Sequence, residues 1–427
     1  MKVLWFSNSP CGSARRFSQK VTRGGWLVSL EDEMKKHSNV ELSVAYISPK
    51  HEEPFEYNGV MYYPVLRECS SNPIKRILQR YKSMNEMDTE ILPRLLDVVN
   101  KCHPDIIHIH GTEESFGLIM NKVRDIPVVI SIQGLIAPYT EKYFSGYPKN
   151  IVCRYEFLLN RIKGISINNS YRNFCKRSSR EMDYLSKCHY IIGRTMFDYR
   201  VPLLANHKMK YFCGEEIMRK PFYEAKWLGG GRRDKFTIVT TISGGVYKGY
   251  ETLLHTATLL KRYADFDFEW QIIGYDSNSQ WVHIAEKYKR MKSVDANIYF
   301  YGRCAAEQMV DILIHSDVYC HVSHIENSPN SVCEAMLLGM PVVATATGGT
   351  QSLLTDGVEG YLIQDGDPYT CAGTIVEIQQ NKERAKNMGE NARLRALGRH
   401  NPKTVGNILI ATYNKIKEDF QKQLYYC

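Results

Sequence analysis

The stretch DVYCHVSHIENSPNSVCEAMLLGMPVVATATGG, from Asp317 to Gly349, carries the clearest structural signal in the sequence. A short apolar run leads into a polar loop that contains Glu326, helical spacing follows, and a second apolar run begins after Gly339 and Pro341. Glycine and proline at that place are typical of a helix end. Because both runs are apolar throughout, the order strand, helix, strand predicts neighbouring parallel strands that are covered on both faces.

The same alternation extends to both sides of this stretch. In the second half lie FTIVTTI, EWQIIG, NIYFYG and YLI, with helical segments between them such as 249–263. The first half repeats the scheme with KVLWFS, ELSVAYI, DIIHIH, PVVISIQ and YIIGR and with a long helical region at 74–102. We therefore expect an α/β protein built from two Rossmann-like, doubly wound parallel-sheet domains.

The length of 427 residues exceeds what one compact core usually holds, which favours two domains. The Gly-rich, charged stretch LGGGRRDK at 228–235 is typical of an interdomain linker. We predict a first domain over 1–222, a linker over 223–235 and a second domain over 236–427, with the last helix packing back on the first domain. Ligands bind beyond the carboxyl ends of parallel strands, so both domains should face a shared cleft.

The net charge of +9 is distributed unevenly along the chain. Residues 1–222 hold 33 Lys/Arg and 23 Asp/Glu, and residues 223–427 hold 22 and 23, so the halves carry +10 and −1. A basic half indicates an anionic partner, such as nucleic acid, a phosphorylated substrate or acidic lipid headgroups. No nucleic-acid-binding module is visible, which argues against the first. The amphipathic stretch KRILQRYK at 75–82 favours an anionic membrane surface.

Twelve cysteines do not indicate a disulfide framework here, because MKVLWFSNSP lacks the apolar core of a signal peptide. No apolar run approaches the ~18 residues of a membrane-spanning helix. We expect a cytoplasmic protein, peripheral on the inner face of the plasma membrane. CxxC and HExxH are absent, and the Asp265-Phe-Asp267 pair precedes a strand, away from the expected cleft. No metal and no cofactor are therefore expected.

Glu326 and Glu334 are candidate ligand-binding carboxylates. A carboxylate beside the free N–H groups of a helix start suits a polyhydroxylated ligand with phosphates, because N–H groups take phosphate oxygens and carboxylates accept from hydroxyls. For Glu334 a structural interpretation is equally open, since Ser331-x-x-Glu334 fits a capping box.

Seven residues separate Glu326 from Glu334, and EAMLLGMPVVAT begins at the second of them. This pattern resembles the Glu-x7-Glu signature of retaining GT-B glycosyltransferases of glycosyltransferase family 4, which transfer a sugar from a nucleotide diphosphate donor. The order of other elements is also similar to that family: Lys248-Gly249 in ISGGVYKGYETLL, YFYGR at 299–303 and DGVEG at 356–360.

The resemblance implies a role for each matching residue. Lys248 would hold the donor diphosphate, Glu334 the ribose hydroxyls and Glu326 the hydroxyls of the transferred sugar. Further donor contacts would come from Gly244, Gly245, Gly302, Arg303, Asn327, Ser328, Asn330 and Ser331. The family's Arg five residues before the Lys is replaced by Ser243. Arg194 and Arg303 are the candidates for the missing cation.

His110 in PDIIHIHGTEE is similar to the family's strand that ends in His-x-His, which implies contact with the sugar near the reacting bond. His110, Lys248 and Glu326 thus form the predicted catalytic set. The loop after the first strand lines the acceptor side in the family. Its predicted acceptor-side residues, which would meet an acceptor pyrophosphate or a membrane unless they form a solvated charge run, are Arg15, Arg16, Gly24 and Gly25.

The resemblance implies a retaining hexosyltransferase that acts on a glycan or lipid-pyrophosphate-linked acceptor in cell-surface polysaccharide biosynthesis. Two alternatives stay open: a nucleotide-sugar 2-epimerase, and a non-catalytic nucleotide-sugar-binding protein, for which Ser243 leaves room. A dinucleotide-binding oxidoreductase is disfavoured because no GxGxxG follows the first strand.

Overall fold

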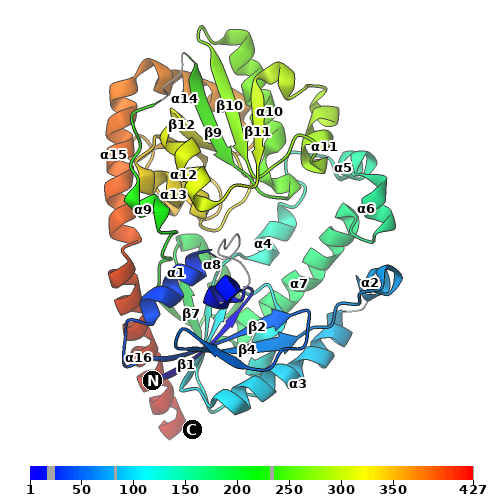
Figure 1. Cartoon of the computed structure of the whole chain (residues 1–427), viewed down its shortest axis with the longest axis vertical. Helices are drawn as coiled ribbons and strands as arrows, with labels where there is room; N and C mark the ends of the chain where they lie inside the picture. The colour runs from blue at the N-terminus through cyan, green and yellow to red at the C-terminus, as the bar shows by residue number, and fades with distance from the viewer. Residues whose placement is uncertain (17–24, 81–83, 231–234, 427) are drawn as a thin grey trace.

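The computed structural model describes residues 1–16, 25–80, 84–230 and 235–426. In this part of the chain two sheets lie one above the other along the longest axis, and helices flank each of them (Figure 1). Strands and helices alternate along both halves. The predicted fold class, two doubly wound parallel-sheet α/β domains, is confirmed.

The first sheet has the strand order β3-β4-β2-β1-β5-β6-β7-β8, and every pair is parallel except β3 with β4. Its strands are β1 (Lys2–Ser7), β2 (Glu41–Ser48), β3 (Phe55–Tyr57), β4 (Val60–Leu66), β5 (Ile106–His110), β6 (Val128–Ser131), β7 (Tyr190–Gly193) and β8 (Lys210–Cys213). The apolar runs predicted β1, β2, β5, β6 and β7. Strands β3, β4 and β8 were not predicted, because Tyr, Pro and charged residues interrupt their apolar pattern.

The second sheet has the order β11-β10-β9-β12-β13-β14 and is parallel throughout. Its strands are β9 (Phe236–Thr241), β10 (Phe268–Ile273), β11 (Ile298–Gly302), β12 (Val318–His321), β13 (Val342–Thr345) and β14 (Tyr361–Ile363). All of these were predicted from their apolar runs.

The helices of the first half are α1 (Gly25–Met34), α2 (Pro73–Arg80), α3 (Met84–Cys102), α4 (Ile136–Glu141), α5 (Lys149–Tyr155), α6 (Leu158–Ile162), α7 (Ile167–Lys187), α8 (Met196–Ala205) and α9 (Pro221–Glu224). Those of the second half are α10 (Tyr250–Tyr263), α11 (Gln280–Lys289), α12 (Ala306–Ile314), α13 (Asn330–Leu338), α14 (Pro368–Gln380), α15 (Lys382–Arg399) and α16 (Pro402–Tyr426). Short 3-10 turns are η1 (Cys11–Arg16), η2 (Ser115–Asn121), η3 (Val246–Lys248), η4 (Val294–Ala296) and η5 (Thr350–Ser352).

The central strands of each sheet are buried on both faces, which explains their long apolar runs. In β1, Val3 and Trp5 pack into one core while Leu4 and Phe6 pack into the core on the opposite face. Successive side chains of a strand point to opposite faces, so a strand with two buried faces cannot alternate with polar residues.

The chain passes from the first domain to the second shortly after β8. Met218 and Phe222 already belong to the core that surrounds α13, and the indole nitrogen of Trp227 donates to the carbonyl of Ser316 at 2.7 Å. The crossing therefore precedes the predicted linker at 223–235, of which residues 231–234 lie outside the described part of the chain.

The last helix returns to the first domain. Helices α15 and α16 run along one side of the molecule, α15 beside the second sheet and α16 beside the first (Figure 1). Leu409 and Tyr413 of α16 share a core with Trp5, whose indole nitrogen donates to the Tyr413 hydroxyl at 3.0 Å. The two domains are thus joined by two chain crossings.

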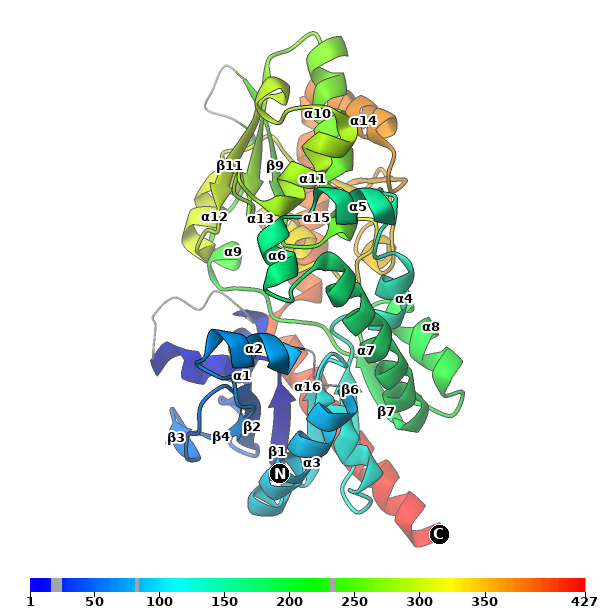
Figure 2. The ribbon, with the colours of Figure 1, turned by 90° about the vertical axis from the view of Figure 1, so that its right-hand side faces the viewer.

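A third connection is an arm formed by α4, α5 and α6, residues 136–162. Figure 2 shows α5 beside α11 of the second domain. Tyr143 and Tyr147 of the arm belong to the core of the second domain, and the amide of Asn160 donates to the side chain of Gln280 at 2.6 Å. This arm was not predicted, because its short helices carry no clear apolar period.

No helix among the described residues is long and apolar enough to cross a membrane.

Candidate active site

Lys248 and Glu326 meet at the carboxyl ends of two neighbouring strands of the second sheet. Lys248 ends the turn η3 after β9, and Glu326 lies in the loop after β12. The Nζ of Lys248 donates to Oε1 of Glu326 at 2.6 Å. The Nε2 of His321 lies 3.4 Å from the same oxygen. From the first domain, the Tyr139 hydroxyl donates to Oε2 of Glu326 at 3.4 Å, so the carboxyl ends of both sheets face each other here.

Both members of this pair are charged. Burial alone would raise the pKa of Glu326, but the charge of Lys248 and the contact with His321 hold it well below its usual range. Burial likewise disfavours the ammonium of Lys248, yet Glu326 raises its pKa. The pair thus places a cation that can take a phosphate oxygen beside a carboxylate that can accept from a hydroxyl.

Asn327 follows Glu326 and is 3% exposed, and neither polar atom of its side chain has a hydrogen-bond partner among the described residues. A buried amide without a hydrogen-bond partner lowers the free energy of unfolding by roughly 1–3 kcal/mol. An amide that is retained in this state beside a charged pair is suited to bind a ligand. Gly349 allows the next turn to pack beneath this loop, because a Cβ there would lie 1.6 Å from the carbonyl oxygen of Asn327. Ser328, also buried, continues the loop.

Glu334 lies in α13 and pairs with Arg219, which precedes α9. The Nε and Nη2 of Arg219 donate to the two carboxylate oxygens of Glu334 at 2.6 Å each. The residue that caps α13 is Pro329, which offers no side-chain hydrogen bond, so the capping-box interpretation of Ser331 and Glu334 is wrong. Burial raises the pKa of Glu334, and Arg219 opposes that rise.

Asn330 and Ser331 form the first turn of α13. Oδ1 of Asn330 is buried and has no hydrogen-bond partner among the described residues. The Asn330 side chain can therefore offer an acceptor to a ligand, as its predicted role requires.

The glycines before Lys248 form an open turn. Gly245 has φ +136° and immediately precedes η3, and both Ser243 and Gly244 are exposed. At the neighbouring strand end, Gly302 donates its N–H to the Tyr275 carbonyl at 3.2 Å, and Arg303 is exposed. These turns follow β9 and β11, on the same sheet edge as the Lys248–Glu326 pair.

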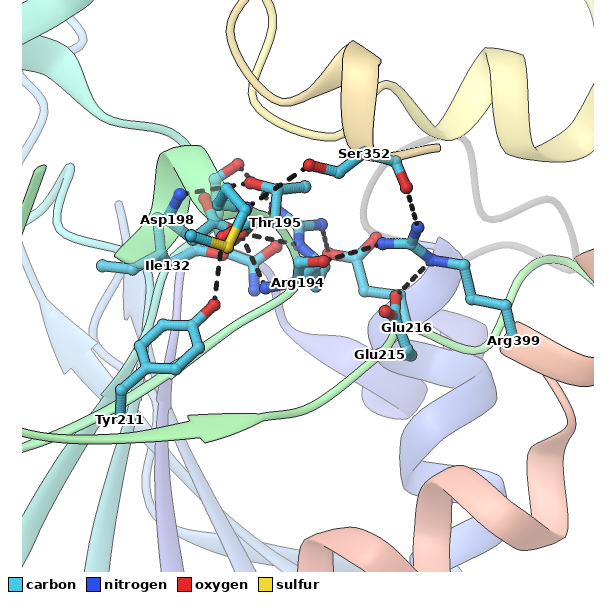
Figure 3. Close-up of polar contacts among 11 residues, drawn as sticks. Ile132, Arg194, Thr195, Asp198, Tyr211, Glu215, Glu216, Ser352 and Arg399 are labelled. Atoms are coloured by element: carbon cyan, nitrogen blue, oxygen red, sulfur yellow. Dashed lines mark hydrogen bonds and ion pairs between the residues drawn. The ribbon is translucent and has the colours of Figure 1, made fainter. Parts of the chain in front are cut away.

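Arg194 does not supply the missing cation. Its guanidinium is 4% exposed, pairs with Glu216 and donates to the carbonyls of Ile132 and Gln133 at 3.1 Å each (Figure 3). Arg399 donates to the Arg194 carbonyl at 2.9 Å from the end of α15. Arg194 thus belongs to a buried ionic network that joins the two chain crossings. This finding corrects the prediction that Arg194 could bind the donor diphosphate.

His110 lies apart from Lys248 and Glu326. It ends β5, is 1% exposed, packs edge-on against Trp5 at 4.7 Å, and has no hydrogen-bond partner for either ring nitrogen within the described chain. Burial lowers the pKa of His110 to about 3, so the ring is neutral. It borders a cavity of about 20 Å³ together with Arg194 and Glu216. Of the predicted catalytic set, only Lys248 and Glu326 are in contact with each other among the described residues.

The predicted acceptor-side arginines both contact other side chains of the first domain. Arg15 donates to both carboxylate oxygens of Asp32, at 3.1 and 2.8 Å, and the guanidinium of Arg16 lies 3.9 Å from the centre of the Phe55 ring. Gly24 lies outside the described residues. Gly25 begins α1 against the side chain of Arg219, where a Cβ would lie 3.0 Å from that side chain.

Tyr139, Arg219 and His321 were not predicted as site residues. His321 ends the apolar strand DVYCH, a position that could have indicated it. Tyr139 and Arg219 reach the site from distant parts of the chain and carry no local signal. No group of three His, Cys, Asp or Glu able to hold a metal occurs in the described part of the chain.

Residues 230–395 match the family model described as Glycosyl transferases group 1. This match lies almost entirely in the second domain, so the similarity to that family concerns the second domain. An uncharacterized glycosyltransferase of Methanocaldococcus jannaschii is 27% identical over 153 residues, which are 34% of this chain and 37% of that protein. The chain therefore spans little more than a third of the length of this curated relative.

Solved structures extend the similarity to both domains. Sucrose-phosphate synthase from Thermosynechococcus elongatus superposes with a TM-score of 0.69 at 15% identity and covers 97% of this chain and 99% of its own. Anabaena HepE in complex with UDP-glucose has a TM-score of 0.60 at 14% identity and covers 100% of both chains. At these identities the likeness concerns the fold, which is the GT-B arrangement of two Rossmann-like domains.

Proposed function

We propose that this protein is a retaining glycosyltransferase of the hexosyltransferase type, with a nucleoside diphosphate sugar as donor. The observation that carries the proposal is the contact of Lys248 with Glu326, 2.6 Å, at the carboxyl ends of two parallel strands. It places a phosphate-binding cation beside a hydroxyl-binding carboxylate, which are the two functions that such a donor requires. The glycosyl transferases group 1 domain supports the same reaction class.

In the proposed reaction the bond between the anomeric carbon and the leaving phosphate oxygen breaks. Lys248 and the backbone N–H groups after β9 stabilise the negative charge that develops on the diphosphate. Glu326 and the amide of Asn327, which has no partner among the described residues, orient the sugar hydroxyls. The acceptor hydroxyl attacks from the same face and its proton passes to the leaving phosphate, so configuration is retained without a protein nucleophile. No metal and no resident cofactor take part in this scheme, because Lys248 supplies the positive charge.

The donor is proposed to be a nucleotide sugar such as a UDP-hexose. HepE, which shares the fold over the whole chain, forms complexes with UDP and with UDP-glucose. Glu334 would accept from the ribose hydroxyls while Arg219 holds it in place, since a carboxylate oxygen can accept more than one hydrogen bond.

The acceptor is proposed to be a glycan or lipid-pyrophosphate-linked sugar in cell-surface polysaccharide biosynthesis, with the protein peripheral on the inner face of the membrane. The charge of +10 in residues 1–222 supports approach to an anionic surface. On α2, Ile74 is 70% exposed and Lys75 is exposed beside it. Flotation with vesicles containing phosphatidylglycerol tests this part: salt-sensitive binding is expected, and its absence would refute membrane association.

Release of nucleoside diphosphate from a panel of UDP-, GDP- and ADP-sugars tests the transfer reaction. Wild-type protein should turn over at least one donor, and Lys248→Ala and Glu326→Gln should each lower kcat/KM by 10²-fold or more. If a donor binds but is never cleaved, the protein is a non-catalytic nucleotide-sugar-binding protein. If the donor is converted to its 2-epimer, the epimerase alternative is correct. Either result would overturn the proposal.

A further inference from the structure

A large cavity lies in the first domain, and no residue predicted for the site lines it. Its volume is about 730 Å³, within the range of small-molecule sites. Its walls come from the β4–α2 connection, α3, the turn after β5, the α6–α7 connection and α7 itself. Apolar side chains such as Met87 and Ile91 line it together with polar ones. A site of this size with mixed walls is suited to an organic ligand rather than an ion.

The charges of the described lining residues cancel. The basic side chains are Arg67, Arg94, Lys176, Arg177 and Arg180. The acidic side chains are Glu68, Asp88, Glu90, Glu113 and Glu114.

Several of these charges are also paired with one another. Arg67 donates to Glu114 at 2.6 Å, and Arg180 donates to Asp88 at 2.8 Å. A diphosphate or polyanion site needs surplus cations, which this balanced wall does not offer. A neutral ligand is therefore favoured.

The polar groups of the walls include both donors and acceptors. Asn169, Ser170 and Asn173 on one face of the cavity can each donate and accept, and the carboxylates accept. Sugar hydroxyls also both donate and accept, so walls of this composition match a saccharide.

Glu113 lies at the end of this cavity, where β1, β5 and β6 end. Its Oε2 accepts from the Asn8 amide at 3.2 Å, and a Cβ on Gly111 would lie 2.0 Å from the same oxygen. Its Oε1 lies 3.5 Å from the Cβ position of Gly134, which precedes α4 and therefore Tyr139, the partner of Glu326. The glycines leave room for the carboxylate at the edge that faces the second domain.

Arg177 joins the cavity wall to the donor side. Its Nε donates to the Glu113 carbonyl at 3.0 Å, and its guanidinium lies 5.7 Å from the Phe174 ring centre. Tyr143 packs 5.1 Å from Phe174 and 5.9 Å from Tyr247, the neighbour of Lys248. One set of aromatic contacts therefore runs from the cavity wall to the lysine of the donor site.

We propose that this cavity binds a neutral saccharide as the acceptor, with Glu113 accepting a hydrogen bond from the hydroxyl at the end that faces Lys248 and Glu326. The proposal rests on the proposed transfer reaction and names its acceptor class and acceptor site. It assigns acceptor binding to this cavity instead of to Arg15 and Arg16.

Glu113 also gives the acceptor site a defined pH response. Burial raises the pKa of Glu113 to about 7, against the opposing charge of Arg177, while Glu181 of the same helix adds to the rise. From the end of β1 it faces the neutral amide of Asn8. Since only the carboxylate accepts strongly, acceptor binding should strengthen as pH rises through 7.

Saturation-transfer NMR with four methyl glycosides, those of glucose, galactose, mannose and N-acetylglucosamine, tests the cavity without any donor. At least one neutral glycoside should show transfer to the wild type, and glucose 1-phosphate should show none. Asn173→Trp, which fills the cavity from an exposed helix position, should abolish the signal. The matched control Arg172→Trp, on the same helix but outside the lining, should retain it.

With a donor and the glycoside that binds, Glu113→Gln should raise the acceptor KM about tenfold or more. The variant should also lose the decrease in acceptor KM that the wild type shows between pH 6 and 8. Nucleoside diphosphate binding should be unchanged. Preference for glucose 1-phosphate, a signal that survives Asn173→Trp, or no binding of any glycoside would each overturn the proposal. Because the NMR measurement uses no donor, it tests glycoside binding even if the transfer reaction itself fails.

Discussion

Arg219 and Glu334 form a bidentate ion pair, with two hydrogen bonds of 2.6 Å, that joins the segment entering the second domain to helix α13. Gly25 at the start of α1 packs on the same arginine. One side chain thus contacts the first domain, the chain crossing and the helix that follows the Glu326 loop. Its loss should affect both stability and donor binding.

Arg219→Gln should lower the free energy of unfolding by roughly 3–5 kcal/mol, because it leaves the buried Glu334 carboxylate without its partner. The neighbouring Lys220→Gln is a matched control: Lys220 is exposed and pairs with Glu224 on the surface, so a change within about 0.5 kcal/mol is expected. Urea unfolding measures both. Equal stability of the two variants would show that the pair does not hold α13.

Gly349→Ala should disrupt the site through the backbone. The added Cβ would lie 1.6 Å from the Asn327 carbonyl oxygen, so the loop that carries Glu326 must move, at a cost of about 1–3 kcal/mol. Gly373→Ala is the control, because nothing lies within 4 Å of its added Cβ in α14, and a gain of roughly 0.5–1 kcal/mol is expected. Thermal unfolding and nucleoside diphosphate release together check this. Full activity of Gly349→Ala would contradict the packing described.

Stability should fall in acid because of buried neutral histidines. Burial lowers the pKa of His110 to about 3, against 6.5 for the ordinary group. The unfolded chain therefore binds a proton that the folded chain does not, and folding loses stability as pH drops below 6.5. Between pH 7 and 4 this amounts to roughly 3 kcal/mol for this residue.

The thermal midpoint followed against pH for wild type and His110→Gln measures the effect. The variant should lose less stability on acidification, whereas His51→Gln, at an exposed position, should follow the wild type. Parallel curves for all three proteins would mean that His110 is protonated in the folded state.

The sequence predicted those parts of the molecule that depend on local patterns. Apolar runs identify strands that are buried on both faces, and the spacing of Glu326 and Glu334 together with Lys248-Gly249 identified the edge of the second sheet. Arg219 could not be predicted, because its partner Glu334 lies 115 residues away and no spacing rule connects them.

The arm at 136–162 and the surroundings of His110 could not be predicted from local sequence patterns either. The arm's helices are stabilised by the core of the second domain rather than by their own periodicity, so tertiary packing overrides the local signal. His110 was assigned by its position at a strand end, whereas its side chain is enclosed by Trp5, Trp26 and His108. Strand position alone does not give the direction of a side chain.

Isothermal titration of wild type, Lys248→Ala and Glu326→Gln with UDP, GDP and ADP measures whether the Lys248–Glu326 pair binds the donor diphosphate. We expect the wild type to bind at least one of them and Lys248→Ala to bind it at least about tenfold more weakly, because a charge-assisted hydrogen bond to phosphate is lost. Glu326→Gln should bind it as tightly or more tightly, since Lys248 is then released from its carboxylate partner. Wild-type affinity in Lys248→Ala would contradict the assignment of this pair as the donor site.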